Sequence, residues 1–567
     1  MCGILALLNA KPGLQETVRY HLSLLRHRGP DATGLSTLTN KNGTHYLGHT
    51  RLSIIDPESG AQPFETPRGS ILAVNGEIYN CGVLNTRHKG ELQTRSDCEC
   101  IAHLYDQMHD TWPTQFTSKT QHPMERLCCM LNGVFAFVCM NVENNKVWAA
   151  RDPLGVVPLY YGYKRDGTMA FASEIKALNG LVDTISEFPP GHYYNSSDNS
   201  FKKYYRPGWV SSLCHGNGQY SYPIWNKKDV RHEQIQIKLE EAVEKRMMTD
   251  VPWGVLLSGG LDSSIIAALA SASEEEAFQR RINTFSIGLE GSPDLAAAEV
   301  MAKHIGSKHR SYTFTIEEAL IAIPEVIRHL ETYDVTTIRA GVPMYLLARH
   351  IKATGTKMVL SGEGADEIYG GYMYFHNCPN WEEFFQETQR KVFDLHHYDC
   401  LRANKAMAAW GVECRVPFLD MSHLEYAMKI HPISKMPSED RMEKHILRES
   451  FAHLLPPEIC WRQKEQFSDG VGYSWIDSIQ EMAKMSISSN VWSSRCLMFP
   501  MHTPKTYEAM YYRLYFDKYF QIPGVSLLVP YGKTCACSSD TAAEWAGNEK
   551  DDASGRSVKT HINSVVE

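Results

Sequence analysis

Short apolar runs separated by glycine, proline, asparagine and aspartate dominate the first two hundred residues. Apolar runs bounded by such turn-forming residues predict β-strands. They fall at residues 1–8, 47–55, 71–74, 134–140, 147–150 and 169–172. Apolar positions with helical spacing occur at 14–25 and 97–108. This part of the chain therefore predicts a mixed α+β domain with antiparallel sheets packed against helices.

The pattern changes at residue 230. Long helical stretches, such as 230–248 and 296–305, alternate with strand-like runs at 254–257, 284–289 and 357–360. Such alternation predicts an α/β domain with a parallel sheet covered by helices. We therefore expect a first domain over residues 2–205, a linker over 206–229, which is polar and aperiodic, and a second domain over 230–530. Residues 531–567, which are poor in apolar side chains, predict a peripheral or disordered tail.

Composition narrows the class of protein. Of the 567 residues, 43% are hydrophobic and 22% are charged, which is typical of globular enzymes and too apolar for intrinsic disorder. The formal charge of -8 disfavours binding to nucleic acid or to anionic membranes. The longest apolar runs are much shorter than the roughly 20 residues of a membrane span. The 15 cysteines are odd in number and scattered, so we expect reduced thiols and a cytosolic protein.

The first candidate for chemistry is Cys2. If Met1 is removed, the cysteine carries both a thiol and an α-amine, whose pKa of about 7.7 to 8.0 suits a general base. A cysteine at position 2 is weak evidence alone. Arg51, Asn75 and Asp97, however, add a guanidinium for an α-carboxylate, an amide for an oxyanion and a carboxylate for an α-ammonium. Together these groups predict hydrolysis of an amino-acid amide.

The sequence motifs around these residues resemble those of N-terminal-nucleophile glutamine amidotransferases. They read Arg26-His-Arg-Gly-Pro-Asp31, Arg51-Leu-Ser-Ile-Ile55, Asn75-Gly-Glu-Ile-Tyr-Asn80 and Ser96-Asp97. The resemblance implies that Cys2 attacks the glutamine side-chain amide, forms a glutamyl thioester and releases ammonia. It also implies that Asn75 and Gly76 form the oxyanion hole. The glutamine-binding residues that it implies are Arg51, Leu52, Ser53, Ile54, Ile55, Asn75, Gly76, Glu77 and Asp97.

One stretch departs from that family. Residues 110–126 are longer than usual for the family and rich in threonine, glutamine and proline. They are separate in sequence from the motif residues. We expect a surface loop there, with little effect on the site.

The second candidate site begins where a predicted strand runs into Ser258-Gly-Gly-Leu-Asp262-Ser-Ser264 and then a helix. Backbone N–H groups at such a helix start bind anions. The segment lacks the Gly-Lys-Ser/Thr ending of a Walker motif. It resembles instead the pyrophosphate loop of ATP pyrophosphatases, which cleave ATP between the α and β phosphates. A second glycine-rich turn, Ser361-Gly-Glu-Gly-Ala-Asp366-Glu367, is strongly acidic, and a triphosphate beside it requires Mg²⁺.

A glutaminase followed by an ATP pyrophosphatase resembles the glutamine-hydrolysing asparagine synthetases over about residues 2–530. Further sequence motifs that resemble this family lie at 331–339, 398–405, 413–420 and 461–470. The resemblance implies that aspartate attacks the α-phosphorus of ATP, giving β-aspartyl-AMP and pyrophosphate. Ammonia then displaces AMP and must reach the adenylate by a shielded path between domains. A homodimer is also implied.

The resemblance also implies roles for residues of the second domain. Asp262 and Asp366 would hold Mg²⁺ and pyrophosphate, and Lys464 would neutralise charge on the leaving pyrophosphate. Thr336 and Arg339 are suited to binding the carboxylates of aspartate, since arginine offers a bidentate fork. Glu363 would either accept the proton of ammonia or assist adenylate formation, and both roles stay open. The ATP-binding residues that it implies are Leu256, Leu257, Ser258, Gly259, Gly260, Asp262, Ser263, Ser264, Ile287, Ser361 and Gly362.

Three other functions compete with this interpretation. β-Lactam synthetases and peptide cyclases share the architecture but typically lack an N-terminal cysteine, so the retention of Cys2, Arg51, Asn75 and Asp97 argues against them. A non-catalytic sensor of glutamine and nucleotide would have no need for every catalytic position. A phosphosugar amidotransferase would lack the Ser-Gly-Gly-Leu-Asp-Ser segment.

Overall fold

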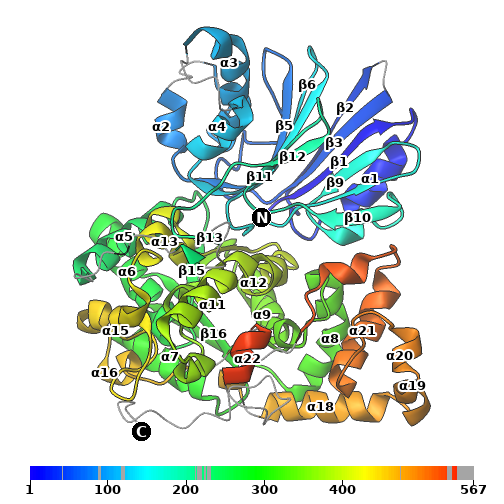
Figure 1. Cartoon of the computed structure of the whole chain (residues 1–567). Coiled ribbons are helices and arrows are strands. Elements are labelled where there is room, and N and C mark those ends of the chain that lie inside the picture. The colour runs from blue at the N-terminus through cyan, green and yellow to red at the C-terminus, as the bar shows by residue number, and fades with distance from the viewer. Residues whose placement is uncertain are drawn as a thin grey trace.

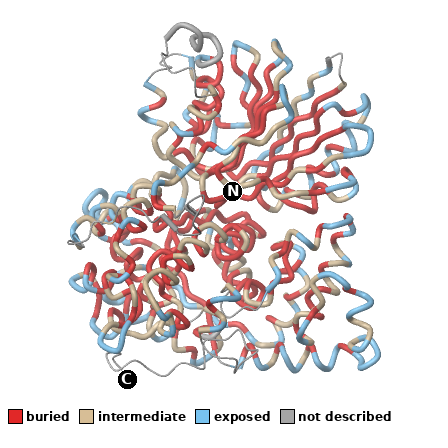
Figure 2. The backbone as a smooth tube through the Cα atoms, in the orientation of Figure 1, coloured by how far each residue is buried: buried red, intermediate tan, exposed pale blue. Residues whose placement is uncertain are grey.

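The computed structural model shows two domains stacked on one another, with the N-terminus at the boundary between them (Figure 1). The structure describes residues 1–40, 43–86, 91–115, 122–210, 212–213, 220–221, 225, 231–465, 467–472, 474–532 and 539–545. Buried segments fill the centre of each domain and also surround the N-terminus (Figure 2). The start of the chain is therefore enclosed between the domains.

The first domain contains two antiparallel sheets of six strands each. The first sheet has the order β10-β8-β9-β1-β3-β2 and the second the order β12-β11-β7-β6-β5-β4. The strands are β1 (Gly3–Ala10), β2 (Ala32–Asn40), β3 (Gly43–Arg51), β4 (Phe64–Glu65), β5 (Ser70–Ile78), β6 (Gly133–Asn141), β7 (Lys146–Arg151), β8 (Tyr160–Tyr163), β9 (Met169–Ala172), β10 (Thr184–Glu187), β11 (His192–Asn195) and β12 (Ser200–Lys203). This arrangement confirms the predicted antiparallel α+β domain.

Alternate side chains of the strands explain the layering of this domain. Ile4 and Leu47 of the first sheet share one core with Ala73 and Val138 of the second, so the two sheets pack face to face. Helices cover the outer faces: α1 (Gln15–Ser23) packs on the first sheet, and α3 (Cys100–Gln115) and α4 (Pro123–Met130) pack on the second. The short helix α2 (Cys81–Asn85) follows β5.

The second domain is built around a parallel sheet of order β17-β16-β15-β18-β19, as predicted. Its strands are β15 (Trp253–Leu256), β16 (Asn283–Gly288), β17 (Lys308–Thr313), β18 (Met358–Leu360) and β19 (Glu413–Arg415). Apolar side chains of α5, α6 and α7 form one core cluster with the sheet, and those of α8, α9 and α12 form another. These helices are α5 (His232–Arg246), α6 (Leu261–Phe278), α7 (Pro293–His304), α8 (Ile316–Leu330), α9 (Val335–Ala353) and α12 (Asp399–Ala408).

Shorter helices complete the second domain. They include α10 (Ala365–Tyr369), α11 (Trp381–Asp394), η4 (Leu395–His397), α13 (Met421–Ala427), α14 (Pro432–Lys435), α15 (His445–Phe451), η6 (Ala452–Leu454), α16 (Pro457–Cys460), α17 (Phe467–Gly470), α18 (Ser474–Ser486), α19 (Ser489–Ser493), α20 (Arg495–Met498), α21 (Tyr507–Tyr519) and α22 (Asp540–Trp545). Helix α22 lies in the predicted tail, and its Trp545 packs near Tyr374 and Phe375. This part of the tail is a peripheral ordered helix, and residues 546–567 lie outside the described residues.

Two predictions of local structure need correction. Residues 110–126 were expected to form a loop, but α3 continues to Gln115 and α4 begins at Pro123. Proline is well tolerated in the first turn of a helix, because its missing N–H has no helical partner there. The strand expected over 47–55 ends at Arg51, and the segment after it is a loop.

Within the expected linker the described residues include the short strands β13 (Ser212–Leu213) and β14 (Tyr220–Ser221), and most other linker positions lie outside the described residues.

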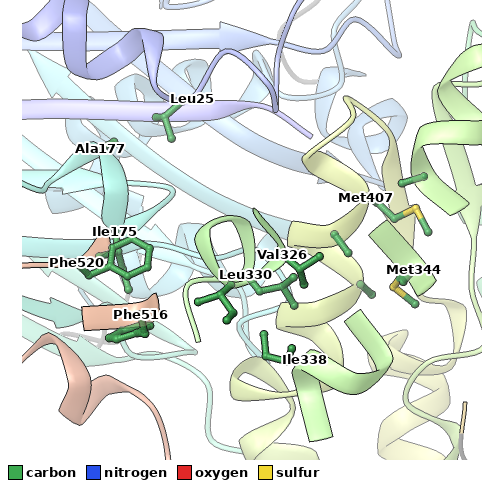
Figure 3. Close-up of a cluster of buried hydrophobic side chains, with 14 of the residues drawn as sticks. Leu25, Ile175, Ala177, Val326, Leu330, Ile338, Met344, Met407, Phe516 and Phe520 are labelled. Atoms are coloured by element: carbon green, nitrogen blue, oxygen red, sulfur yellow. The ribbon is translucent and has the colours of Figure 1, made fainter. Parts of the chain in front are cut away.

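A continuous apolar cluster joins the domains (Figure 3). Ile175 and Ala177 of the first domain belong to the same cluster as Leu330, Met407 and Phe516 of the second. Buried ion pairs lie beside it, including one between Lys405 Nζ and Glu331 Oε2, 2.6 Å apart. The contact between domains therefore resembles a protein core more than a loose hinge.

Candidate active site

Cys2 lies at the domain boundary, directly before β1. Its backbone N–H donates to Asn75 Oδ1 at 2.8 Å, and its Sγ lies 3.9 Å from the carbonyl oxygen of Leu52. The preceding Met1 is buried, and its ammonium lies 3.2 Å from Glu413 Oε2 of the second domain. Burial raises the pKa of the Cys2 thiol. Such a thiol needs a base beside it before it can act as a nucleophile.

Asn75 and Gly76 are consecutive residues of β5. Asn75 Oδ1 accepts the Cys2 hydrogen bond, whereas its Nδ2 is buried without a hydrogen-bond partner among the described residues. Gly76 has φ of 146°, and a Cβ there would lie 2.1 Å from the carbonyl oxygen of Val134. Only glycine fits this position. An unpaired amide donor beside a nucleophile is the arrangement that stabilises an oxyanion.

Two buried carboxylates lie close to this group. Asp97 Oδ2 accepts from the Ile78 N–H at 2.7 Å, and Glu77 Oε2 lies 3.0 Å from Arg415 Nη2 of the second domain. Arg415 Nε also donates to Glu413 Oε1 at 2.6 Å. Burial raises the pKa of both Glu77 and Asp97, and the charge of Arg415 opposes the effect. The second domain thus supplies a cation to the predicted glutamine site.

Arg51 ends β3 and stabilises the loop that follows. Its Nη2 donates to the carbonyl oxygens of Ile55 and Asp56 at 3.0 and 2.5 Å, and its Nη1 donates to that of Pro57 at 3.3 Å. The Ser53 N–H donates to Asp31 Oδ2 at 2.8 Å. These contacts fix the segment 52–55 beside Cys2. Binding of a glutamine carboxylate by Arg51 stays a prediction.

The second predicted site is a cavity of about 160 Å³ at the carboxyl ends of the parallel strands. The strand order changes direction at β15, and ligands of open α/β sheets bind at such a switch point. The predicted residues that line the cavity are Leu256, Leu257, Ser258, Gly260, Asp262, Ser263, Ile287, Thr336, Ser361, Gly362, Glu363, Asp366 and Lys464. Two other predicted residues, Gly259 and Ser264, are not part of the lining. Gly259 has φ of 73° and packs against the backbone of α7, and the Ser264 hydroxyl is buried.

Two glycine-rich turns form the floor of the cavity. Ser258 Oγ lies 3.1 Å from Ser263 Oγ and accepts from the Gly260 N–H at 3.3 Å, which closes the turn into α6. The turn after β18 approaches so closely that a Cβ on Gly362 would lie 2.8 Å from the Ser263 nitrogen. Both turns therefore lie at the start of α6, and the N-terminus of a helix suits a phosphate.

Four charged side chains form one ion cluster in this cavity. Lys444 Nζ lies 2.8 and 2.7 Å from the two carboxylate oxygens of Asp262 and 2.7 Å from Asp366 Oδ1. Lys464 Nζ lies 2.9 Å from Asp366 Oδ2. The two lysines hold the pKa of Asp366 well below its usual range, and Asp366 raises that of Lys464. Burial raises the pKa of Asp262, and the charge of Lys444 opposes the rise.

Glu363 faces the same cavity from the second turn. Its Oε1 accepts from Arg402 Nη2 at 2.8 Å, and Arg402 also pairs with Asp399. Burial raises the pKa of Glu363, while Arg402 opposes the rise. The carboxyl group is placed to accept or hold a proton near bound substrate.

Comparison with known proteins identifies the family. Residues 1–194 match a glutamine amidotransferase domain, and residues 234–385 and 377–521 match the asparagine synthase family. Asparagine synthetase B [glutamine-hydrolyzing] of Escherichia coli (strain K12) is 44% identical over 99% of this chain and 99% of its own length. Asparagine synthetase [glutamine-hydrolyzing] 1 of Arabidopsis thaliana is 45% identical over 100% of this chain and 95% of its own length. This chain belongs to the glutamine-hydrolysing asparagine synthetases.

Membership of the asparagine synthetases confirms the predicted fold classes, an N-terminal-nucleophile glutaminase followed by a parallel-sheet synthetase domain. Among the helices that the structure describes, none is both long and apolar enough to cross a bilayer.

One predicted site residue of this asparagine synthetase lies elsewhere. Arg339 is buried, is not part of the cavity lining, and its Nε and Nη2 donate to the two carboxylate oxygens of Glu508 at 2.8 and 2.7 Å. This bidentate pair occupies the Nε–Nη2 edge of the guanidinium. The geometry therefore does not support the prediction that Arg339 binds aspartate. Thr336 does line the cavity, and its buried hydroxyl has no hydrogen-bond partner among the described residues.

Several basic residues of the site were not predicted from the sequence. Lys444 lies between the two predicted metal ligands, Arg402 faces Glu363, and Arg415 faces Glu77. Arg402 and Arg415 fall within segments that resemble the family, so their positions were available as candidates. Lys444 has a left-handed backbone with φ of 57°, which a sequence pattern does not reveal.

Proposed function

We propose that this asparagine synthetase makes L-asparagine from L-aspartate with ammonia taken from glutamine, releasing glutamate, AMP and pyrophosphate. The observation that carries the proposal is the position of Arg415 between the two predicted sites. Its side chain pairs with Glu77, and its carbonyl oxygen accepts from the Ser361 N–H at 2.9 Å in the cavity wall. One residue therefore connects the predicted glutamine site with the predicted nucleotide site.

The first half-reaction uses the groups around Cys2. The thiolate attacks the glutamine amide carbon, and the tetrahedral oxyanion takes hydrogen bonds from Asn75 Nδ2 and the Gly76 N–H. The α-amine of Cys2 takes the thiol proton and passes it to the amide nitrogen. Collapse of the intermediate then breaks the C–N bond, so ammonia leaves and a glutamyl thioester remains, which water hydrolyses to glutamate. Glu77 and Asp97 bind the α-ammonium of glutamine, which compensates their mutual repulsion.

Gly76→Ala should lower the free energy of unfolding by about 1–3 kcal/mol and abolish glutamate release. A Cβ 2.1 Å from the Val134 carbonyl oxygen forces β5 away from β6 and moves the oxyanion donors. Gly82→Ala is the matched control, because a Cβ at Gly82 has nothing within 4 Å. Urea denaturation and a glutaminase assay check both effects. Equal stability and activity of the two variants would refute the steric argument.

The second half-reaction takes place in the cavity. A β-carboxylate oxygen of aspartate attacks the α-phosphorus of ATP, and pyrophosphate leaves against Lys464 and the N-terminus of α6. Ammonia then attacks the activated carbonyl carbon, AMP leaves, and Glu363 accepts the surplus proton or assists the first step. The Thr336 hydroxyl is available to bind aspartate.

The residues present also fit Mg²⁺. Asp262 and Asp366 lie close enough to share the single ammonium nitrogen of Lys444, so their oxygens can reach one hard cation together with phosphate oxygens. Mg²⁺ bound there neutralises charge on the triphosphate and polarises it for attack. Lys444 and Lys464 would add positive charge beside Asp366.

The proposal also covers the partners, the cellular compartment and the oligomeric state of the enzyme. The partners are the small molecules glutamine, aspartate and ATP, without nucleic acid or membrane. We propose a cytosolic homodimer, in line with the resemblance and the negative net charge of the chain. Size-exclusion chromatography with light scattering measures the mass in solution.

Isotope tracing tests the proposed function as a whole. With ATP, Mg²⁺, aspartate and amide-¹⁵N glutamine, mass spectrometry should find the label in the asparagine side chain. Glutamate, AMP and asparagine should accumulate in equal amounts. Unlabelled asparagine, or glutamate without asparagine, would contradict the proposal.

Retention of Met1 should silence glutamine hydrolysis. An amide nitrogen at Cys2 cannot accept a proton, whereas a free α-amine with a pKa near 8 can. An N-terminal tag should therefore remove glutaminase activity, and the same tag after Glu567 should not. Synthesis from ammonium salts should continue in both proteins. Full glutaminase activity in a protein proven by mass spectrometry to retain Met1 would exclude the amine as the base.

A further inference from the structure

Two histidines and a glutamate meet at the boundary between the domains, away from both catalytic sites. Glu187 ends β10 of the first domain, and His396 and His397 belong to η4 of the second. His396 Nε2 lies 3.6 Å and His397 Nδ1 lies 3.3 Å from Glu187 Oε2. The three donor atoms lie within 4.8 Å of one another. Among the described residues this is the one cluster of three such side chains close enough to share a metal ion.

The hydrogen bonds around the cluster leave the right atoms available for a metal. His396 Nδ1 lies 2.7 Å from the Phe393 carbonyl oxygen. Because a carbonyl only accepts, Nδ1 carries the proton and Nε2 offers a lone pair toward Glu187. Arg151 Nη1 donates to Glu187 Oε1 at 2.7 Å, which leaves Oε2 as the ligand atom. Outer hydrogen bonds of this kind orient the ligands of metal sites.

The surroundings also suit a bound ion. His396 is only 9% exposed, so an ion bound by its imidazole would be shielded from solvent. A cavity of about 20 Å³ adjoins the three side chains and is also lined by Tyr160 and Glu331. This volume is enough for about one water molecule. A fourth ligand can therefore be a water molecule.

We propose that Glu187, His396 and His397 form a binding site for a divalent transition metal, with Zn²⁺ as the best match. Two imidazole nitrogens and one carboxylate oxygen are typical zinc ligands, whereas Mg²⁺ prefers oxygen ligands alone. The bound metal would link β10 of the glutaminase domain to η4 of the synthetase domain. This site is independent of the proposed chemistry, because none of its residues belongs to either catalytic site.

Zinc binding to the full-length enzyme tests the proposal. The metal-free protein is titrated with Zn²⁺ in competition with a chromophoric chelator, and its melting temperature is measured with and without Zn²⁺. Wild-type protein should bind one Zn²⁺ more than the variants His397→Ala and Glu187→Gln, or bind it at least about tenfold more tightly. Zn²⁺ should raise the melting temperature of the wild type but not that of His397→Ala or Glu187→Gln. His453→Ala, which removes an exposed histidine on η6, is the matched control and should behave as wild type.

Thiols elsewhere in the chain also bind zinc, so Co²⁺ serves as a second probe. Co²⁺ at this site should give visible absorption bands without a thiolate charge-transfer band, and His397→Ala should lose them. Anomalous scattering from a zinc-soaked crystal should place the ion between Glu187 and the two histidines. Equal zinc binding by wild type, His397→Ala and Glu187→Gln would overturn the proposal. A Co²⁺ spectrum that arises only from thiolates would overturn it as well.

Discussion

Cys2→Ala should lower glutamine-dependent asparagine synthesis by about a thousandfold or more, because the variant lacks the proposed nucleophile. Synthesis from ammonium salts should stay within a few-fold of wild type, because the synthetase cavity lies in another domain. The measurement is the rate of asparagine formation with each nitrogen source at saturating ATP and aspartate.

Cys129→Ala is the matched control for this variant, because Cys129 is an exposed cysteine of the same domain. It should retain both activities. Loss of the ammonia-dependent rate in a folded Cys2→Ala protein would contradict the separation of the two sites. Circular dichroism and the melting temperature verify that each variant is folded.

Loss of either lysine in the cavity should strongly lower the rate of synthesis from both nitrogen sources. Lys464→Ala and Lys444→Asn each remove a cation beside Asp366, so charge on the leaving pyrophosphate is no longer neutralised. We expect each rate to fall by about 10²- to 10³-fold, the usual cost of removing one donor that stabilises transition-state charge. Asparagine is chosen at position 444 because it tolerates the left-handed backbone there.

Glutamine hydrolysis should continue in both lysine variants, since Cys2 and the residues around it are unchanged. Lys429→Ala, which removes a surface lysine paired with Glu425, should leave every activity intact. Pyrophosphate release, measured by a coupled assay, shows whether the lysine variants have lost the reaction with ATP. Wild-type release by Lys464→Ala or Lys444→Asn would show that the cluster around Asp366 is not the ATP site.

The elements that were predicted best are those marked by a local sequence pattern. Apolar runs bounded by turn residues placed the cores of β1, β5, β6 and β9, and the segment from Ser258 to Ser264 placed the strand, turn and helix of the cavity floor. Strands with little apolar character were missed. β17 (Lys308–Thr313) and β12 (Ser200–Lys203) are edge strands with few apolar residues, and four of the six residues of β17 are exposed, so neither strand carries a continuous hydrophobic signal.

Contacts between distant segments could not be predicted from one sequence. Arg339 was expected to bind a substrate carboxylate because of its chemistry, but its partner is Glu508, 169 positions away. Lys444 is likewise 182 positions from Asp262. Side-chain type shows that an arginine or lysine can pair with a carboxylate, but only the fold decides which carboxylate is near. Where several candidates exist, chemistry alone leaves the pairing open.

The most direct test of the central claim uses aspartate with both β-carboxylate oxygens replaced by ¹⁸O. In the proposed reaction one of these oxygens attacks the α-phosphorus and leaves with AMP, while the other stays in asparagine. Mass spectrometry should therefore find one ¹⁸O in each AMP and none in pyrophosphate. If ADP forms instead and the label appears in inorganic phosphate, aspartate is activated at the γ-phosphorus and the proposed adenylation is wrong.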